Sequence, residues 1–271
     1  MRTILCPIDF SETSIKALLY AYDIALATGA SLSLLHTYHI PRVVQLMKAY
    51  PQPDLEAHIT YEREALEKMD NLISWLNKIY APAAVKSFYK TVSSFAVDEI
   101  IKTAYEQYVD LIVLGTKNTK DLKSIFFGTN TVRVIEETHL PVLVVPALAT
   151  YTTISHMLYI SHQSHKQEIQ FANNFAKVFN ASVTLVHMQE KNLAASHQSQ
   201  AIAAGTLPAK AQQLYGDVIS SGKSIQQTIS DFTNEHASSM LAISASRRQL
   251  LDEVISEKNP CPLHMPVLIL P

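Results

Sequence analysis

Short apolar runs alternate with longer amphipathic segments along the chain. Such runs are typical of strands buried on both faces of a parallel sheet. In the first part of the chain they predict strands at residues 3–9, 31–36, 84–92, 110–115 and 142–146, separated by helices at 12–28, about 55–80, 94–108 and about 124–138. Ser11 with Ser14, and Ser93 with Ser94, are predicted helix N-caps, and Gly29 a C′ residue. The pattern predicts an α/β fold with an open parallel sheet.

The same pattern is written twice. GASLSLLH, which begins at Gly29, resembles NASVTLVH, which begins at Asn180, and HLPVLVVP resembles HMPVLILP at the end of the chain. Second-copy strands are predicted near residues 156–161, 182–188, 213–220, 239–244 and 267–270. We therefore expect two Rossmann-like domains, residues 1–148 (the first half) and 149–271 (the second half), with a linker at 147–155.

Composition narrows the classes of protein. The 271 residues are 48% apolar and 17% charged, which favours packed cores in two domains of ordinary size. A net charge of −2 without a basic run argues against nucleic acid as a partner. The longest apolar stretch is short and broken by prolines, which argues against a membrane span. Two cysteines cannot form a disulfide framework, so we expect a cytoplasmic protein.

The expected sheet topology predicts where a ligand would bind. Right-handed crossovers predict the strand order 3-2-1-4-5 in each sheet, and ligands of such sheets bind where the winding reverses, beyond the carboxyl ends of strands one and four. Asp9 and Gly115 stand at those two ends. Gly128 and Thr129 are expected near the start of the following helix, whose N–H groups and dipole suit a phosphate.

These residues resemble the signature of the universal stress protein family. That signature is a glycine, two residues, a second glycine, nine residues, then glycine and Ser or Thr, after an Asp that closes the first strand. Here Gly115, Asn118, Gly128 and Thr129 have this spacing, with Asn118 in place of the second glycine, and Asp9 lies in CPIDFS. Asn tolerates positive φ, so the loop shape is expected to survive.

The resemblance implies an adenine nucleotide, ATP or AMP, with Mg²⁺ as an open question. It implies that Asp9 lies beside the nucleoside, that Gly115 and Thr116 approach the ribose and phosphates, and that Asn118, Gly128, Thr129 and Asn130 hold the phosphates. The alternative is that Asp9 caps a helix and the glycines only turn the chain.

The second half lacks these residues. Its first predicted strand ends without an Asp, and its fourth has no glycine at the corresponding places. GDVISSGKS at 216–224 resembles a phosphate loop but has one residue too many. His156, His162, His165, His187 and His264, with Cys261, carry a zinc hypothesis, but they lack tight ligand pairs, so we predict no metal. The second half is interpreted as a degenerate, structural copy.

Three functions remain open from the sequence. The favoured one is a stress-response or regulatory protein that binds nucleotide with little or no catalysis, since no hydrolase or phosphotransfer signature is present. The alternatives are a protein-interaction scaffold whose pocket is empty or holds another small molecule, and, least favoured, a hydrolase. The fold alone does not choose among them.

The last strands of the two halves are predicted to pair. Residues 142–145 and 267–270 are apolar and lie at sheet edges in the predicted order. We expect antiparallel pairing between them, in an intramolecular pseudo-twofold dimer, with further assembly into a homodimer left open.

Overall fold

The computed structural model describes residues 1–38, 53–80, 85–116, 128–147, 149, 154–161, 166–187, 225–235, 239–244 and 265–271. The strands of the first half are β1 (Thr3–Pro7), β2 (Ser31–Tyr38), β3 (Ser87–Ser93), β4 (Leu111–Gly115) and β5 (Val142–Val145). Its helices are α1 (Glu12–Thr28), α3 (Pro53–Ile79), α4 (Ala96–Glu106) and α5 (Thr129–Glu137). The second half contributes β6 (His156–Ser161), α6 (Lys166–Val178), β7 (Ser182–His187), α7 (Ile225–Glu235), β8 (Ser239–Ser244) and β9 (Val267–Leu270).

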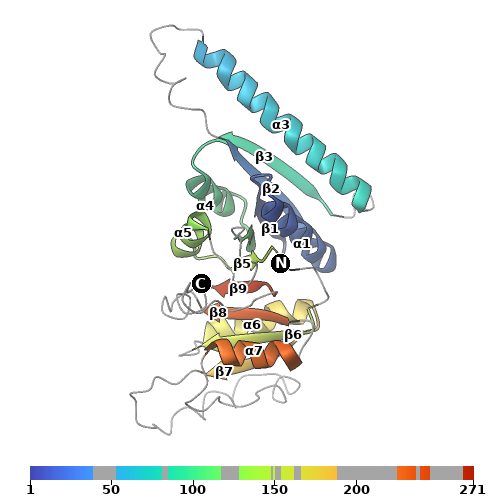
Figure 1. Ribbon diagram of the computed structural model, residues 1–271, viewed down its shortest axis with the longest axis vertical. Coiled ribbons are helices and arrows are strands. Elements are labelled where there is room, and N and C mark those ends of the chain that lie inside the picture. Colours follow the sequence, from blue (N-terminus) through green and yellow to red (C-terminus); the bar gives the residue numbers. More distant parts are fainter. Residues whose placement is uncertain are drawn as a thin grey trace.

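The described strands form one nine-stranded sheet in the order β3-β2-β1-β4-β5-β9-β8-β6-β7 (Figure 1). The pairs within each half are parallel, and the predicted order 3-2-1-4-5 is confirmed for the first half. β5 and β9 pair antiparallel, with Leu143 opposite Leu268, as the sequence predicts. The predicted strand at 213–220 lies outside the described residues.

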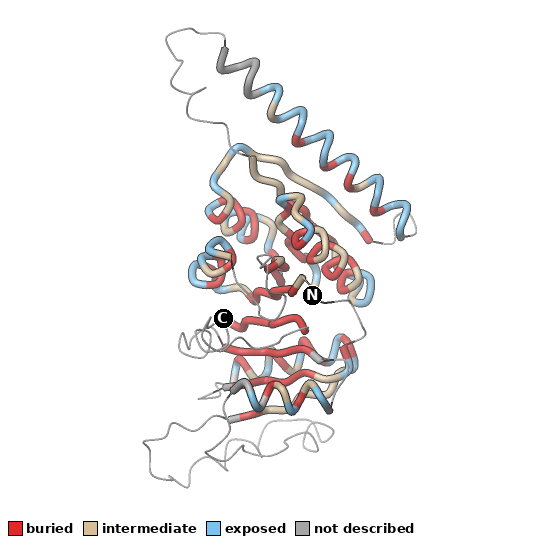
Figure 2. Tube along the Cα trace, in the orientation of Figure 1, coloured by how far each residue is buried: buried red, intermediate tan, exposed pale blue. Residues whose placement is uncertain are grey.

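Helices cover both faces of the sheet. α1 lies on one side of the first-half strands and α4 and α5 on the other (Figure 1). Alternate residues of β1 pack on opposite faces of the sheet. Ile4 and Cys6 belong to a core with α1, α3 and α6. Leu5 belongs to a second core with α4, α5 and α7. Each core contains residues of both halves, and Figure 2 shows that β5 and β9 are buried along their whole length. No helix among the described residues is long and apolar enough to cross a membrane.

The helix ends follow the local sequence at α1 but not at α4. The Ser11 hydroxyl accepts a hydrogen bond from the Ser14 amide at 3.2 Å, and Gly29 ends α1 with φ 68°, so both predictions are confirmed. The predicted cap of α4 at Ser93 and Ser94 is wrong. Phe95 holds the N-cap position without a side-chain bond, because Ser93 still pairs with Tyr38 in the sheet.

The turn between the first helix and second strand has the same geometry in both halves. Asn180 adopts φ 55° where Gly29 adopts φ 68°. The amide of Ala30 donates to Ala25, and that of Ala181 donates to Ala176, at 3.1 and 3.0 Å. Asn tolerates the left-handed region better than most residues, which explains why it can replace glycine there.

Candidate functional site

The candidate site lies at the carboxyl edge of β1 and β4. The two strands pair in parallel, with Leu5 opposite Ile112, so their carboxyl ends lie side by side. β2 and β5 flank them on opposite sides, which makes this the point where the winding reverses. Asp9 follows β1 and Gly115 ends β4, as predicted.

The Asp9 carboxylate is held by the turn that starts α1. Its Oδ1 accepts hydrogen bonds from the Ser11 amide at 2.9 Å and the Ser11 hydroxyl at 2.5 Å. Partial burial would raise the pKa of Asp9, but the hydrogen bonds from Ser11, with a smaller one from Ser14, outweigh it and the pKa lies below its ordinary value. Asp9 is therefore a fixed, ionised acceptor, although its side chain is exposed.

Phe10, directly after Asp9, has an unusual backbone conformation. Its φ of 62° lies in the left-handed region, which costs a bulky L-residue on the order of 1 kcal/mol. The ring packs edge-on against the imidazole of His36, with centroids 4.6 Å apart. His36 in turn contacts the Ile8 carbonyl through Nδ1 at 2.7 Å. Neither ring stands out in the sequence as a site residue, although LLH at 34–36 is part of the repeated phrase.

Gly115 is required by packing. A Cβ there would lie 2.5 Å from the Thr13 carbonyl oxygen and 3.2 Å from the Ser14 amide nitrogen. The first turn of α1 therefore rests directly on the end of β4. Thr116 is buried, and its amide donates to the Val145 carbonyl at 3.1 Å, so the group it could offer a ligand is its hydroxyl.

The N-terminus of α5 has no capping side chain. Gly128 is the N-cap residue, with φ −61° and ψ 155°, and offers no side chain to bond the first amides. Thr129 and Asn130 are exposed in the first turn. That turn contains no acidic residue, whereas α1 carries Glu12 and α4 carries Asp98 and Glu99 in theirs. An anion is therefore better accommodated at α5 than at α1 or α4.

The backbone of Gly128 explains part of its role. Its φ is accessible to any residue, so glycine is not needed for the turn itself. The absence of a Cβ leaves room for an anion to approach the amides. Asn118, the remaining predicted phosphate residue, lies outside the described residues.

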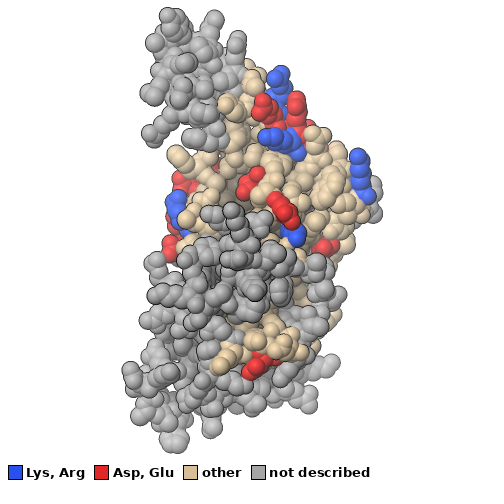
Figure 3. Space-filling view, in the orientation of Figure 1, with Lys and Arg blue, Asp and Glu red and all other residues tan. Residues whose placement is uncertain are grey.

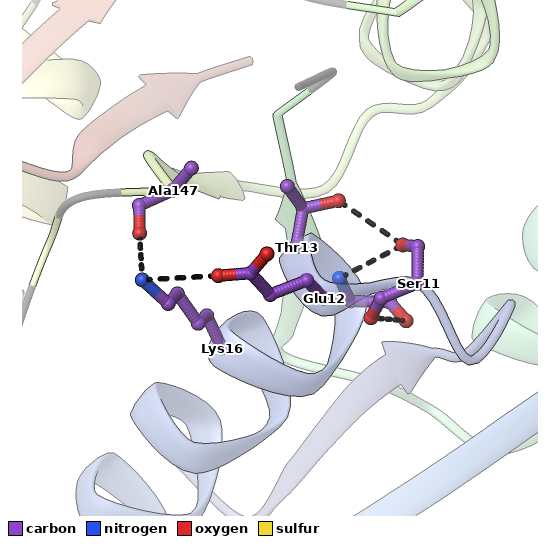
Figure 4. Close-up of polar contacts among 6 residues, drawn as sticks. Ser11, Glu12, Thr13, Lys16 and Ala147 are labelled. Atoms are coloured by element: carbon purple, nitrogen blue, oxygen red, sulfur yellow. Dashed lines mark hydrogen bonds and ion pairs between the residues drawn. The ribbon is translucent and has the colours of Figure 1, made fainter. Parts of the chain in front are cut away.

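The start of α1 is also tied to the end of β5. Lys16 donates to the Ala147 carbonyl and lies 3.7 Å from Glu12, while the Ser11 hydroxyl lies 3.1 Å from that of Thr13 (Figure 4). On the face drawn in Figure 3, acidic and basic side chains of the described residues lie close together over the first half. The first turn of α1 thus joins the candidate site to the segment that leads into the second half.

The corresponding edge of the second half is built differently. Ser244 ends β8 opposite Leu270 of β9, just as Gly115 ends β4 opposite Val145 of β5. Ser244 is buried, and so is Glu168 in the first turn of α6. The Glu168 carboxylate accepts a hydrogen bond from the Tyr159 hydroxyl at 2.7 Å. The described part of this edge therefore carries a buried carboxylate, and a serine stands at the position that Gly115 holds in the first half.

The zinc hypothesis gains no support from the described residues. No group of three His, Cys, Asp or Glu side chains there is arranged to hold a metal. The Nδ1 of His156 lies 2.7 Å from the Ser182 hydroxyl. Cys261 and the His162, His165 and His264 residues lie outside the described residues, as does the side chain of His187.

Comparison with known proteins adds the family. The model of the universal stress protein family matches residues 1–146, just over half of the 271. A universal stress protein of Methanocaldococcus jannaschii is 30% identical over 156 residues, which are 53% of this chain and 94% of that protein. A second one from the same organism is 30% identical over 146 residues, covering 53% of this chain and 81% of that protein.

A solved structure is similar in fold over nearly the whole chain. The crystal structure of a universal stress protein from Archaeoglobus fulgidus superposes with a TM-score of 0.71 and covers 99% of this chain and 97% of that one. The two sequences are 16% identical, so this likeness concerns the fold alone. On the match over residues 1–146, this chain belongs to the universal stress protein family.

Proposed function

We propose that this chain is a stress-response protein that binds ATP or AMP at the carboxyl edge of its first half, with little or no catalysis. The proposal is supported by the adjacent carboxyl ends of β1 and β4, which lead to Asp9 and end at Gly115, and by the start of α5, which has no side-chain cap. Nucleotides bind at this place in open α/β sheets.

The proposed pose follows from the donors and acceptors. The phosphates lie against the first amides of α5, with the Thr129 hydroxyl and Asn130 as further donors. Asp9 accepts hydrogen bonds from the nucleoside, since its carboxylate is held ionised by Ser11. Gly115 and the Thr116 hydroxyl lie beside the ribose and phosphates. Asn118 completes the phosphate loop in this proposal.

Calorimetric titration tests the proposal directly. ATP and AMP, each with and without Mg²⁺, are expected to bind with one site per chain, because the second half has no counterparts of Asp9, Gly115 and Gly128. Gly128→Val is expected to abolish binding in a folded protein, since valine tolerates the observed φ and ψ but fills the approach to the amides. Two equivalent sites, or unchanged affinity of the variant, would contradict the pose. Absence of binding in the wild type would favour the scaffold function.

We further propose that residues 1–148 and 149–271 are tandem copies that form an intramolecular pseudo-dimer across β5 and β9. The repeated turn at Gly29 and Asn180, the parallel order within each half and the antiparallel β5–β9 pair support this. The Methanocaldococcus relative is 94% covered by 53% of this chain, so a unit about the size of one half occurs as a whole protein.

Expression of residues 1–148 alone tests the tandem arrangement. The freed β5 edge is expected to drive self-association in sedimentation experiments, because an apolar edge strand without a partner pairs with another. A strictly monomeric half would argue against the pseudo-dimer. We place the protein in the cytoplasm, where the buried free thiol of Cys6 would stay reduced.

A further inference from the structure

The end of β1 is braced by β2 beyond the last paired residue of the strand. The Ile8 amide donates to the Leu35 carbonyl at 2.8 Å, and the next residue of β2, His36, reaches the Ile8 carbonyl with its Nδ1 at 2.7 Å. Because a carbonyl only accepts hydrogen bonds, Nδ1 must carry the proton in this contact. Both polar groups of the Ile8 backbone are thus bonded to adjacent residues of β2.

The same imidazole supports the residue on the other side of Asp9. The Phe10 ring packs against His36 at a centroid distance of 4.6 Å and an interplanar angle of 65°. Edge-to-face contacts of this kind are favourable, and here the contact offsets the left-handed backbone of Phe10. The neighbours of Asp9 on both sides are therefore held by one side chain.

The left-handed turn at Phe10 is what brings Ser11 back to Asp9. With φ of 62° at Phe10, the amide and hydroxyl of Ser11 both reach the Oδ1 of Asp9. A change that lets Phe10 relax to negative φ would swing Ser11 away and release the carboxylate. The direction of the carboxylate thus depends on a contact that His36 makes.

We propose that His36 is a positioning residue of the nucleotide site, which orients the Asp9 carboxylate by holding Ile8 through its Nδ1 and Phe10 through its ring. The assignment of a ligand to this carboxylate rests on the proposed function. The effect of His36 on Asp9 does not, because it rests only on contacts between residues of this chain.

Two variants separate the two contacts of His36. His36→Phe keeps a ring against Phe10 and removes the hydrogen bond to Ile8. His36→Asn keeps a donor near the place of Nδ1 and removes the ring. His156→Phe is the matched control, since His156 is also a strand histidine with a bonded Nδ1 but lies in the second half.

The measurement is the titration of the Asp9 carboxyl carbon by NMR in the full chain without nucleotide, followed by calorimetry with ATP. At least one His36 variant is expected to raise the midpoint of Asp9 toward its ordinary value and to weaken ATP binding roughly tenfold, with the thermal midpoint close to wild type. The control should change neither. A residue that only stabilises the fold would lower the thermal midpoint and leave the Asp9 titration unchanged.

The outcomes are distinct. An Asp9 midpoint unchanged in both variants overturns the inference, whatever happens to ATP. A shifted midpoint in a protein that binds no nucleotide supports the positioning of Asp9 by His36 and overturns the proposed function instead. If His36→Phe fails to fold, Phe10→Ala removes the ring contact and leaves a residue for which positive φ is strained, and it must shift the Asp9 midpoint for the inference to stand.

Discussion

Among the described residues, the carboxyl edges of the two halves have the same arrangement of strands and different side chains. In the first half, glycine ends β4, and the first turn of α5 carries no acidic residue. In the second half, Ser244 takes the glycine position and Glu168 is buried against Tyr159. Two edges with the same strand arrangement thus carry different side chains, which is why the fold alone does not indicate that both bind the same ligand.

The largest expected effect is that of filling the space at Gly115. Gly115→Ala is expected to lower the free energy of unfolding by about 2 kcal/mol or more, because the new Cβ meets the backbone of α1 at 2.5 Å and a backbone cannot rotate away. Chemical denaturation measures the loss. The matched change, Ser244→Gly, should cost about 1 kcal/mol from chain entropy and a lost side chain. Equal losses of unfolding free energy in the two variants would contradict a special packing requirement at Gly115.

The buried pair of the second half gives the next effect. Tyr159→Phe removes the donor to Glu168 and leaves a buried carboxylate with one bond fewer, so a loss of about 2 kcal/mol is expected. ATP affinity measured by calorimetry should stay at the wild-type value, since the pair lies in the other half. A variant that lost nucleotide binding without losing stability would contradict the separation of the two edges.

The next effect on stability concerns the N-cap of α1 in the first half. Ser11→Ala is expected to cost about 1 kcal/mol, because the Ser14 amide loses its acceptor and Asp9 loses a donor. Ser94→Ala is the control near α4, which has no side-chain cap, and should change stability little. Thermal or urea unfolding compares the two. A larger loss at Ser94 would mean that α4 is capped after all.

The smallest effect is the pH dependence of Asp9. Its pKa in the folded chain is lowered, so its contribution to stability is complete above the unfolded pKa of about 3.9 and is lost as the pH falls through the folded value. The difference in unfolding free energy between wild type and Asp9→Asn should be constant from neutral pH to about 5 and shrink below 4. Solvent exposure keeps it small. A difference in unfolding free energy that grew as the pH fell would contradict a lowered pKa of Asp9.

The sequence predicts the frame well where the signal is local. The predicted bounds of α1 are the observed ones, because Ser11 and Gly29 mark its ends chemically. The strands at 239–244 and 267–270 also coincide with β8 and β9, since short apolar runs between polar segments have few alternatives. The start of α4 was predicted two residues early, because the serines before it looked like caps while β3 extends to Ser93.

Some features of the candidate site could likewise be predicted from the sequence, and others depend on tertiary contacts. The ends of β1 and β4, near Asp9 and at Gly115, could be predicted to lie side by side, since parallel strands bring their carboxyl ends to one edge. Gly128 was predicted at the start of the following helix and is the N-cap of α5. Tertiary contacts decided the rest: Gly115 under the α1 backbone, His36 between Ile8 and Phe10, and Glu168 against Tyr159. The pattern of apolar residues therefore determined the elements, and with the right-handed crossover rule it predicted the strand order of the first half. The burial and direction of each polar group depended on distances between residues far apart in the chain, which only packing sets.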